Sequence, residues 1–273
     1  MRVMFLGTAA AEGFPGLWCT CEHCEEARRD GGNSLRLRAS LLVNDDLIID
    51  LNSDLMQAAA RFGLRLTSVT SALVTHTHGD HLDLKNLDLR VPGFRAQPLP
   101  LLTVFGSEQV VARVHTLGDR LNEAEVRTQA VQPFMPFEAG CYSVTAFPAS
   151  HAVEGALFYA VEQGGTSLLY ALDSGPWSDE AWNGLAEHRF DLVIVEETMG
   201  DKQYWGHMGL RDVIAAKDRM TKEAMLKQGG RFLVTHIGHH GNPTHEELAR
   251  LLQAHGIEVA YDGAQVVVGE EQA

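Results

Sequence analysis

The stretch His76-Thr77-His78-Gly79-Asp80-His81 decides the fold of this chain, because it places three imidazoles and one carboxylate within six residues. Burying such a cluster without partners would be costly, and exposing it would serve no structural purpose. Neutral imidazole and ionised carboxylate are ligands that suit zinc and its neighbours among the transition metals. The stretch therefore predicts a metal site, and two metals would need additional ligands from elsewhere in the chain.

Other histidine and aspartate residues stand where short apolar runs end. The runs 47–49, 144–147, 168–172 and 232–235 lead directly, or within a few residues, to Asp50, His151, Asp173 and His236. Such runs are typical of buried strands, and groups at strand ends in a layered α/β fold collect along one edge of the sheets. We therefore expect these residues to join the 76–81 cluster. The alternative is that the aspartates are helix caps or turn residues.

Three of the four cysteines lie within Cys19-Thr20-Cys21-Glu22-His23-Cys24. Since the chain begins without a signal-peptide pattern, we expect a cytoplasmic protein, and disulfides are rare in that compartment. Clustered thiolates then favour a structural zinc with three sulfur ligands and one nitrogen ligand. His239 is the candidate for the nitrogen ligand, with His240 in reserve. The alternatives are a redox pair of Cys21 and Cys24, or three ordinary thiols.

Composition describes an acidic protein without membrane-spanning segments. The net charge is −14, from 22 Lys and Arg against 36 Asp and Glu, which makes nucleic acid an unlikely partner. No apolar run approaches the roughly 18 residues that suggest a membrane span. A local exception is the basic stretch with Arg28, Arg29, Arg36 and Arg38. These arginines either face a small anionic molecule or belong to solvated helix and strand faces.

Helical spacing and caps predict five helices that would cover two central sheets. They span residues 54–62, 107–117, 179–187, 209–227 and 244–255. The segments 62–70 and 92–101 are expected to be connectors, and neither is long enough to be a flexible linker. We therefore predict that residues 1–273 form a single domain, with the cysteine-rich zinc loop 19–24 near its N-terminus.

With these residues identified, the chain resembles the metallo-β-lactamase superfamily, which carries His-x-His-x-Asp-His and later His, Asp and His residues at strand ends. The resemblance implies an α/β fold of four layers, the αββα sandwich. It also implies the ligand sets: His76, His78 and His151 for one metal, Asp80, His81 and His236 for the second, Asp173 as the bridge, and Asp50 orienting the site from behind. Position 78 is a glutamate in the oxygen-reducing diiron members, so the histidine here favours hydrolysis.

Within that superfamily, the chain resembles the phosphoribosyl 1,2-cyclic phosphate phosphodiesterases of the bacterial carbon–phosphorus lyase pathway. The similar stretches include Gly7-Thr8, Gly13-Phe14-Pro15, the cysteine loop with Ala27-Arg28-Arg29, the segment 235–239 and Tyr261-Asp262-Gly263. The resemblance places the structural zinc on Cys19, Cys21, Cys24 and His239, and it suggests a homodimer. It makes His207 the general acid, although the chain has Gly209 where that family has an acidic residue, and residues 201–203 differ from the family's loop.

The predicted function is therefore hydrolysis of a small anionic phosphodiester, similar to phosphoribosyl 1,2-cyclic phosphate, by hydroxide held between two divalent metals, zinc or manganese. Asp80 and His207 are the predicted catalytic residues. Three alternatives would use the same metal site: a thioester or lactone hydrolase, a tRNA-processing nuclease, and a relative that acts in cofactor biosynthesis. A fourth alternative is a ligand-binding protein without turnover, in which zinc serves only to stabilise the fold.

Overall fold

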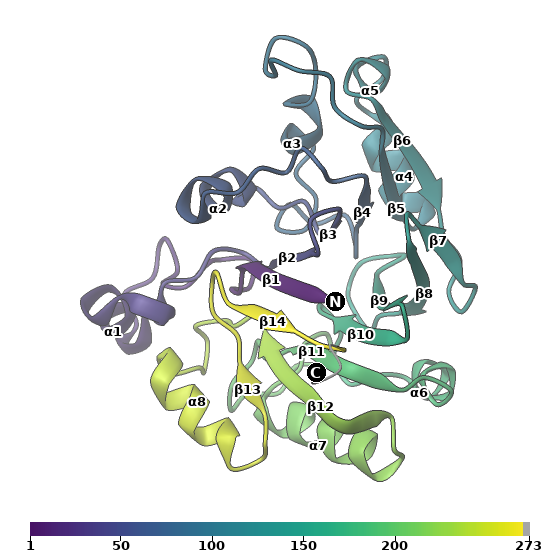
Figure 1. Cartoon of the computed structure of the whole chain (residues 1–273). Coiled ribbons are helices and arrows are strands. Elements are labelled where there is room, and N and C mark those ends of the chain that lie inside the picture. Colours follow the sequence, from purple (N-terminus) through teal and green to yellow (C-terminus); the bar gives the residue numbers. More distant parts are fainter. Residues whose placement is uncertain (270–273) are drawn as a thin grey trace.

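Two mixed β-sheets pack face to face, with helices on both outer surfaces, in the computed structural model of this chain, which describes residues 1–269 (Figure 1). This is the αββα sandwich that the sequence predicts. Helices α2 to α5 lie on the upper side of Figure 1, whereas α7 and α8 lie on the lower side. In this part of the chain, no helix is long and apolar enough to cross a membrane.

The bounds of the elements are as follows. The strands are β1 (Arg2–Gly7), β2 (Ser40–Val43), β3 (Leu47–Ile49), β4 (Ser71–Leu73), β5 (Leu102–Gly106), β6 (Val126–Ala130), β7 (Phe137–Ala139), β8 (Tyr142–Pro148), β9 (Leu157–Gln163), β10 (Thr166–Ala171), β11 (Phe190–Glu196), β12 (Leu226–Thr235), β13 (Glu258–Val259) and β14 (Gln265–Val267). The helices are α1 (Glu22–Asp30), the 3₁₀-helix η1 (Gly32–Ser34), α2 (Leu55–Phe62), α3 (Lys85–Asp88), α4 (Glu108–His115), α5 (Arg120–Glu123), α6 (Asp179–Leu185), α7 (Leu210–Lys222) and α8 (His245–Gln253).

Each sheet combines an antiparallel part with a parallel part. The first sheet has the order β14-β1-β2-β3-β4-β5-β6, and its strands from β3 to β6 are parallel. The second sheet has the order β13-β12-β11-β10-β9-β8-β7, and its strands from β10 to β13 are parallel. The carboxyl ends of parallel strands meet at one edge of a sheet, which is where open α/β sheets bind ligands.

The core has three apolar layers, which explains why the strands read as nearly continuous apolar runs. Between the sheets lie side chains such as Phe5, Tyr159 and Tyr170. One outer layer joins the second sheet to α6, α7 and α8, and the other joins the first sheet to α2 and α4. Because the central strands are covered on both faces, the polar residues that follow their apolar runs are left at the strand ends.

Four of the five predicted helices match the structure to within about two residues at each end. The prediction of a helix over 209–227 is too long, because α7 ends at Lys222 and β12 begins at Leu226. Between them Ala224 has a left-handed backbone, with φ 54°, and this reverses the chain. Helix α1, which follows directly on the cysteine loop, was not among the predicted helices.

Candidate metal centres

The residues predicted to bind metal come together at the carboxyl ends of the parallel strands. Asp50 follows β3, Asp173 lies just beyond β10, and His236 follows β12. All three have a left-handed backbone, with φ of 66°, 47° and 55° respectively. Residues other than glycine seldom adopt this conformation, and such strained positions cluster at functional sites. The chain therefore turns sharply at the point where each strand delivers its polar side chain.

The first ligand group consists of His76, His78 and His151, whose ligand atoms all lie within 4.8 Å of one another. His76 Nε2 is 3.0 Å from His78 Nδ1, and His151 Nε2 is 3.5 Å from the same atom. His151 Nδ1 lies 3.2 Å from the carbonyl oxygen of Gly206, to which it can donate, so Nε2 keeps its lone pair. His76 is buried and His78 is exposed, so the group opens to solvent at His78.

The second ligand group consists of Asp80, His81, Asp173 and His236. His81 Nε2 lies 2.7 Å from Asp173 Oδ2 and 3.2 Å from Asp80 Oδ2, and His236 Nε2 lies 3.1 Å from Asp173 Oδ2. Among the described residues, His81 Nε2, His236 Nε2 and Asp173 Oδ2 are buried and have no hydrogen-bond partner despite these short distances. Because buried polar atoms are costly to leave unpaired, their convergence fits a bound divalent cation.

Asp173 faces both ligand groups, as a bridging carboxylate must. Its Oδ2 belongs to the second group, and its Oδ1 is 3.9 Å from His151 Nε2 in the first. Burial opposes ionisation of Asp173, but His236 and His81 hold the pKa of its carboxyl well below the usual range. Burial likewise opposes a charge on His81, and Asp173 and Asp50 nevertheless raise the pKa of that imidazole well above its usual value. The carboxylates thus make this group a strong site for positive charge.

Side chains behind the second ligand group leave Nε2 free in both of its histidines, His81 and His236. Asp50 is fully buried behind His81, with its Oδ2 2.7 Å from His81 Nδ1. Thr75 holds Asp50 through its backbone N–H, 2.8 Å from Oδ1. His236 Nδ1 is 2.9 Å from the hydroxyl oxygen of Thr198. Such contacts orient ligand histidines and leave Nε2 free for a metal.

His207 lies beside this edge and is held by a residue that the sequence analysis missed. Its Nδ1 is 2.8 Å from Glu196 Oε2 and 3.5 Å from Asp173 Oδ1. Burial opposes a positive charge, but the hydrogen bond and charge of Glu196 raise the pKa of His207 to about 9. Glu196 is fully buried at the end of β11, where the apolar run 192–195 ends, so the strand-end pattern could have found it.

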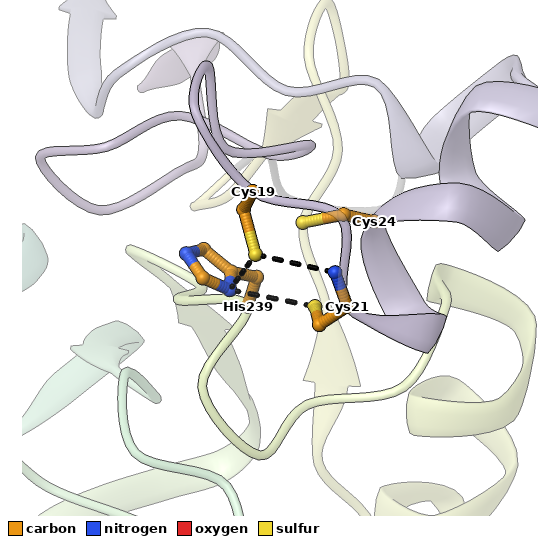
Figure 2. Close-up of side chains that lie close together, drawn as sticks. All are labelled: Cys19, Cys21, Cys24 and His239. Atoms are coloured by element: carbon orange, nitrogen blue, oxygen red, sulfur yellow. Dashed lines mark hydrogen bonds between the residues drawn. The ribbon is translucent and has the colours of Figure 1, made fainter.

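The three cysteines of the loop meet His239, as the sequence predicts (Figure 2). His239 Nδ1 lies 3.6 Å from Cys19 Sγ and 3.7 Å from Cys21 Sγ. Zinc bound tetrahedrally by sulfur and nitrogen would separate such ligand atoms by about 3.6 Å, so the group fits a structural zinc. Backbone N–H groups of Gly16 and Cys21 donate to the sulfurs of Cys24 and Cys19. His240 is exposed and is not part of this group of four.

Three of the arginines near the cysteine loop make contacts within the protein itself. Arg28 donates to the carbonyl oxygens of Cys19 and Gly16, at 2.7 and 2.8 Å, and so supports the zinc loop. Arg36 is buried and bonds to Ala260 and His245. Arg38 pairs with Asp54 at 3.0 Å. The interpretation that these residues face a small anionic molecule therefore has no support in their contacts.

Comparison with known proteins relates the chain to one superfamily. The family described as "Beta-lactamase superfamily domain" matches residues 47–237. Coenzyme PQQ synthesis protein B of Bradyrhizobium diazoefficiens is 31% identical over 152 residues, which are 50% of this chain and 47% of that protein. The match thus spans about half the length of this curated relative.

Two solved structures show the same fold along nearly the whole chain. A diphosphatase of the PhnP family has a TM-score of 0.76 at 23% identity, with 97% of each chain covered. Zinc-bound PqqB from Methylobacterium extorquens also has a TM-score of 0.76, at 20% identity, with 98% of this chain and 100% of that chain covered. At these identities the likeness shows the fold alone.

Proposed function

Because the chain belongs to the β-lactamase superfamily and is a metal-dependent hydrolase, we propose that it hydrolyses a small cyclic phosphodiester of the phosphoribosyl 1,2-cyclic phosphate type. The two ligand groups would hold two divalent metals, zinc or manganese, and the cysteine loop would hold a structural zinc. Residues from both sheets contribute ligands, so the site depends on the complete sandwich.

The observation that carries the proposal is the pairing of His207 with Glu196 next to the ligand groups. Cleavage of a phosphodiester releases an alkoxide, which needs a proton, whereas a thioester releases a thiolate that can leave without one. The His207 ring centroid is 5.0 Å from that of His151, so a proton on His207 is close to any substrate bound there. A hydrolase that acted only on thioesters would have no need of this pair.

The chain's own groups have separable roles in the proposed reaction. Divalent metals held by the two ligand groups would supply water of lowered pKa and positive charge to a bound phosphoryl group. Glu196 fixes the ring of His207 through Nδ1, so that Nε2–H is the proton available to the leaving sugar oxygen. Burial opposes ionisation of Asp80, but its contact with His81 lowers the pKa of Asp80 below the usual range and keeps it an anionic ligand. Asp50 orients the ring of His81, and Thr198 orients the ring of His236, each through a contact with Nδ1.

The test compares leaving groups in His207→Ala. With a 2′,3′-cyclic nucleotide, whose leaving group is an alkoxide, kcat should fall by about 10² to 10⁴. With bis(p-nitrophenyl) phosphate, whose p-nitrophenolate leaves without a proton, the loss should be about tenfold or less. His255→Ala, which removes an exposed histidine, is the matched control. Equal losses on both substrates would remove the acid role, and hydrolysis of thioesters without phosphodiesters would refute the proposal.

A second candidate substrate is a diphosphate, because the PhnP-family neighbour is described as a diphosphatase. The same ligand groups could face a phosphoanhydride, and a phosphate leaving group depends less on a proton donor than an alkoxide does. A substrate panel that includes a nucleoside diphosphate sugar beside the cyclic diester separates a diphosphatase from a phosphodiesterase. Faster turnover of this substrate than of the cyclic diester, with little effect of His207→Ala, would favour the diphosphatase.

The same purified protein and substrate panel also test two alternative functions. The net charge of −14 disfavours a tRNA-processing nuclease, which would bind RNA with a steep dependence on salt. The similarity to coenzyme PQQ synthesis protein B, which covers about half of that protein, favours a role in cofactor biosynthesis. Metal-loaded protein that hydrolyses no phosphoester in the panel would support that alternative over our proposal.

A further inference from the structure

Two adjacent aromatic side chains, Tyr204 and Trp205, are exposed on the segment that carries His207, with exposed fractions of 44% and 60%. We propose that they form a stacking surface for a planar ring of the substrate, so that the phosphoester this protein cleaves carries a nucleobase. This inference rests on the proposed function, since it keeps the cyclic phosphodiester and the same site, but it replaces the base-free phosphoribosyl 1,2-cyclic phosphate with a nucleoside 2′,3′-cyclic phosphate as the substrate. Aromatic side chains bind nucleobases by stacking, and the contact tolerates any base.

The surface adjoins the metal centres. The ring of Tyr204 stacks on that of His207, with centroids 5.8 Å apart and planes at 25°. Between these aromatic residues and His207, the Gly206 carbonyl oxygen lies 3.2 Å from His151 Nδ1, the ring nitrogen opposite the candidate ligand atom Nε2. A ring that rests against Tyr204 would therefore lie near His207, where a short linker such as a ribose would join it to a phosphate at the ligand groups.

A hollow of about 270 Å³ lies beside the two rings, and its composition suits an uncharged ring. It is lined by Pro176, Gln203, Tyr204, Trp205 and Asp212. The carboxylate of Asp212 disfavours a phosphate there but can accept a hydrogen bond from an exocyclic amine. The amide of Gln203 can both donate and accept. The charged part of the substrate would therefore go to the metals and the planar part to this hollow.

The segment is held in place by backbone contacts that only glycine permits. A Cβ atom on Gly175 would lie 1.8 Å from the carbonyl oxygen of Trp205. A Cβ atom on Gly209 would lie 2.6 Å from the carbonyl oxygen of Lys202. Leu210 N–H also donates to the carbonyl oxygen of Gly200, so backbone hydrogen bonding joins the two sides of the stretch that bears the two aromatic rings. A surface fixed in advance loses less entropy on binding, which favours recognition of a ligand.

The test measures kcat/KM of the metal-loaded protein for two five-membered cyclic diesters, adenosine 2′,3′-cyclic phosphate and ethylene phosphate, which has no base. In Trp205→Ala the ratio of the two values should fall roughly five- to a hundredfold, mainly through KM, because the contact is remote from the reacting bond. Trp205→Phe should keep most of the ratio. Trp18→Ala is the matched control, because Trp18 precedes the zinc loop and is 94% exposed, and it should leave the ratio unchanged.

Two results would overturn the inference. A ratio that changes by less than about twofold in Trp205→Ala would show that the base does not contact the ring. Equal losses on both diesters would show that the segment only positions His207. If neither diester is hydrolysed, the proposed function fails and binding still tests the surface. AMP should then bind more tightly than ribose 5-phosphate, and Trp205→Ala should remove the difference, whereas equal binding to the unaltered protein would refute the stacking surface.

Discussion

At the scale of single residues, the site depends on which nitrogen of each histidine is left free. Nδ1 of His81 is hydrogen-bonded to Asp50, and Nδ1 of His236 is hydrogen-bonded to the hydroxyl of Thr198. The sequence pattern of polar residues at strand ends found Asp50 and His236. It did not find Glu196, although Glu196 also ends an apolar run, at residues 192–195. Thr198 could not be predicted, because its contact with His236 depends on how two strand ends approach each other.

The ligand assignments lead to a direct prediction for Asp80→Ala and His151→Ala. Each variant should lower phosphodiesterase turnover to the background rate, because each removes one metal ligand at the reacting centre. Each should keep most of its fold, because these side chains lie at the sheet edge and outside the apolar layers. Steady-state kinetics together with far-ultraviolet circular dichroism test this. Near-normal rates in either variant would contradict the assignment, and His255→Ala serves as the control for a histidine on the surface.

His245 gives a prediction for the dependence of stability on pH. Burial, and the Arg36 guanidinium 3.0 Å from Nδ1, lower the pKa of His245 to about 4. The unfolded chain binds a proton on this residue near pH 6.5, so the folded state loses stability as the pH falls from about 6.5 towards 4. Above this range the residue is neutral in both states and has no effect.

The measurement compares urea unfolding of the unaltered protein and His245→Gln, whose amide oxygen can still accept from Arg36. Between pH 7 and pH 5 the unaltered protein should lose roughly 1 kcal/mol more free energy of unfolding than the variant. The difference between the two proteins isolates His245 from other groups that titrate in this range. Parallel losses in both would show that His245 does not titrate in this way.

At the scale of elements, strands were easier to predict than their ends. Buried parallel strands give apolar runs of fixed length, so β3, β4, β10 and β12 were visible in the sequence. The left-handed turns after three of these strands were not visible, because aspartate and histidine adopt that conformation only where surrounding contacts stabilise it. The overlong helix prediction at 209–227 has a similar cause, since helical spacing continues past the reversal at Ala224.

The zinc loop gives a prediction at this scale. Cys21→Ser should remove one metal per chain and lower the melting temperature by about 5 °C or more, because a structural zinc contributes folding free energy. The loop is joined to the catalytic edge through His239, which groups with the three cysteines and lies three residues beyond His236. Turnover should therefore fall as well. Mass spectrometry of metals and thermal unfolding test this.

The matched control for the zinc loop is Cys141→Ser, because Cys141 is exposed and lies outside the cysteine cluster. This variant should keep both its metal content and its melting temperature. An unchanged metal content in Cys21→Ser would remove the case for a structural zinc, and the cysteine pair would then be better explained as a redox centre.

At the scale of the whole molecule, the layered architecture followed from the motif and its resemblance, but the order of strands did not. Strand β14 comes last in the sequence and yet pairs with β1 in the first sheet. The pairing of β14 with β1 depends on contacts between segments far apart in the sequence, and local sequence patterns do not reveal it. The single domain over residues 1–273, the homodimer and the cytoplasmic location remain predictions. Light scattering would test the homodimer.

We propose that one chain holds two catalytic metals and one structural zinc and uses the two catalytic metals to cleave phosphodiesters. The most direct test is metal content per chain, measured by plasma mass spectrometry on protein purified without chelator, alongside hydrolysis of cyclic and linear phosphodiesters. The account predicts about three metals per chain together with phosphodiesterase activity. About one metal per chain and no activity would contradict it, because only the cysteine site would then be filled.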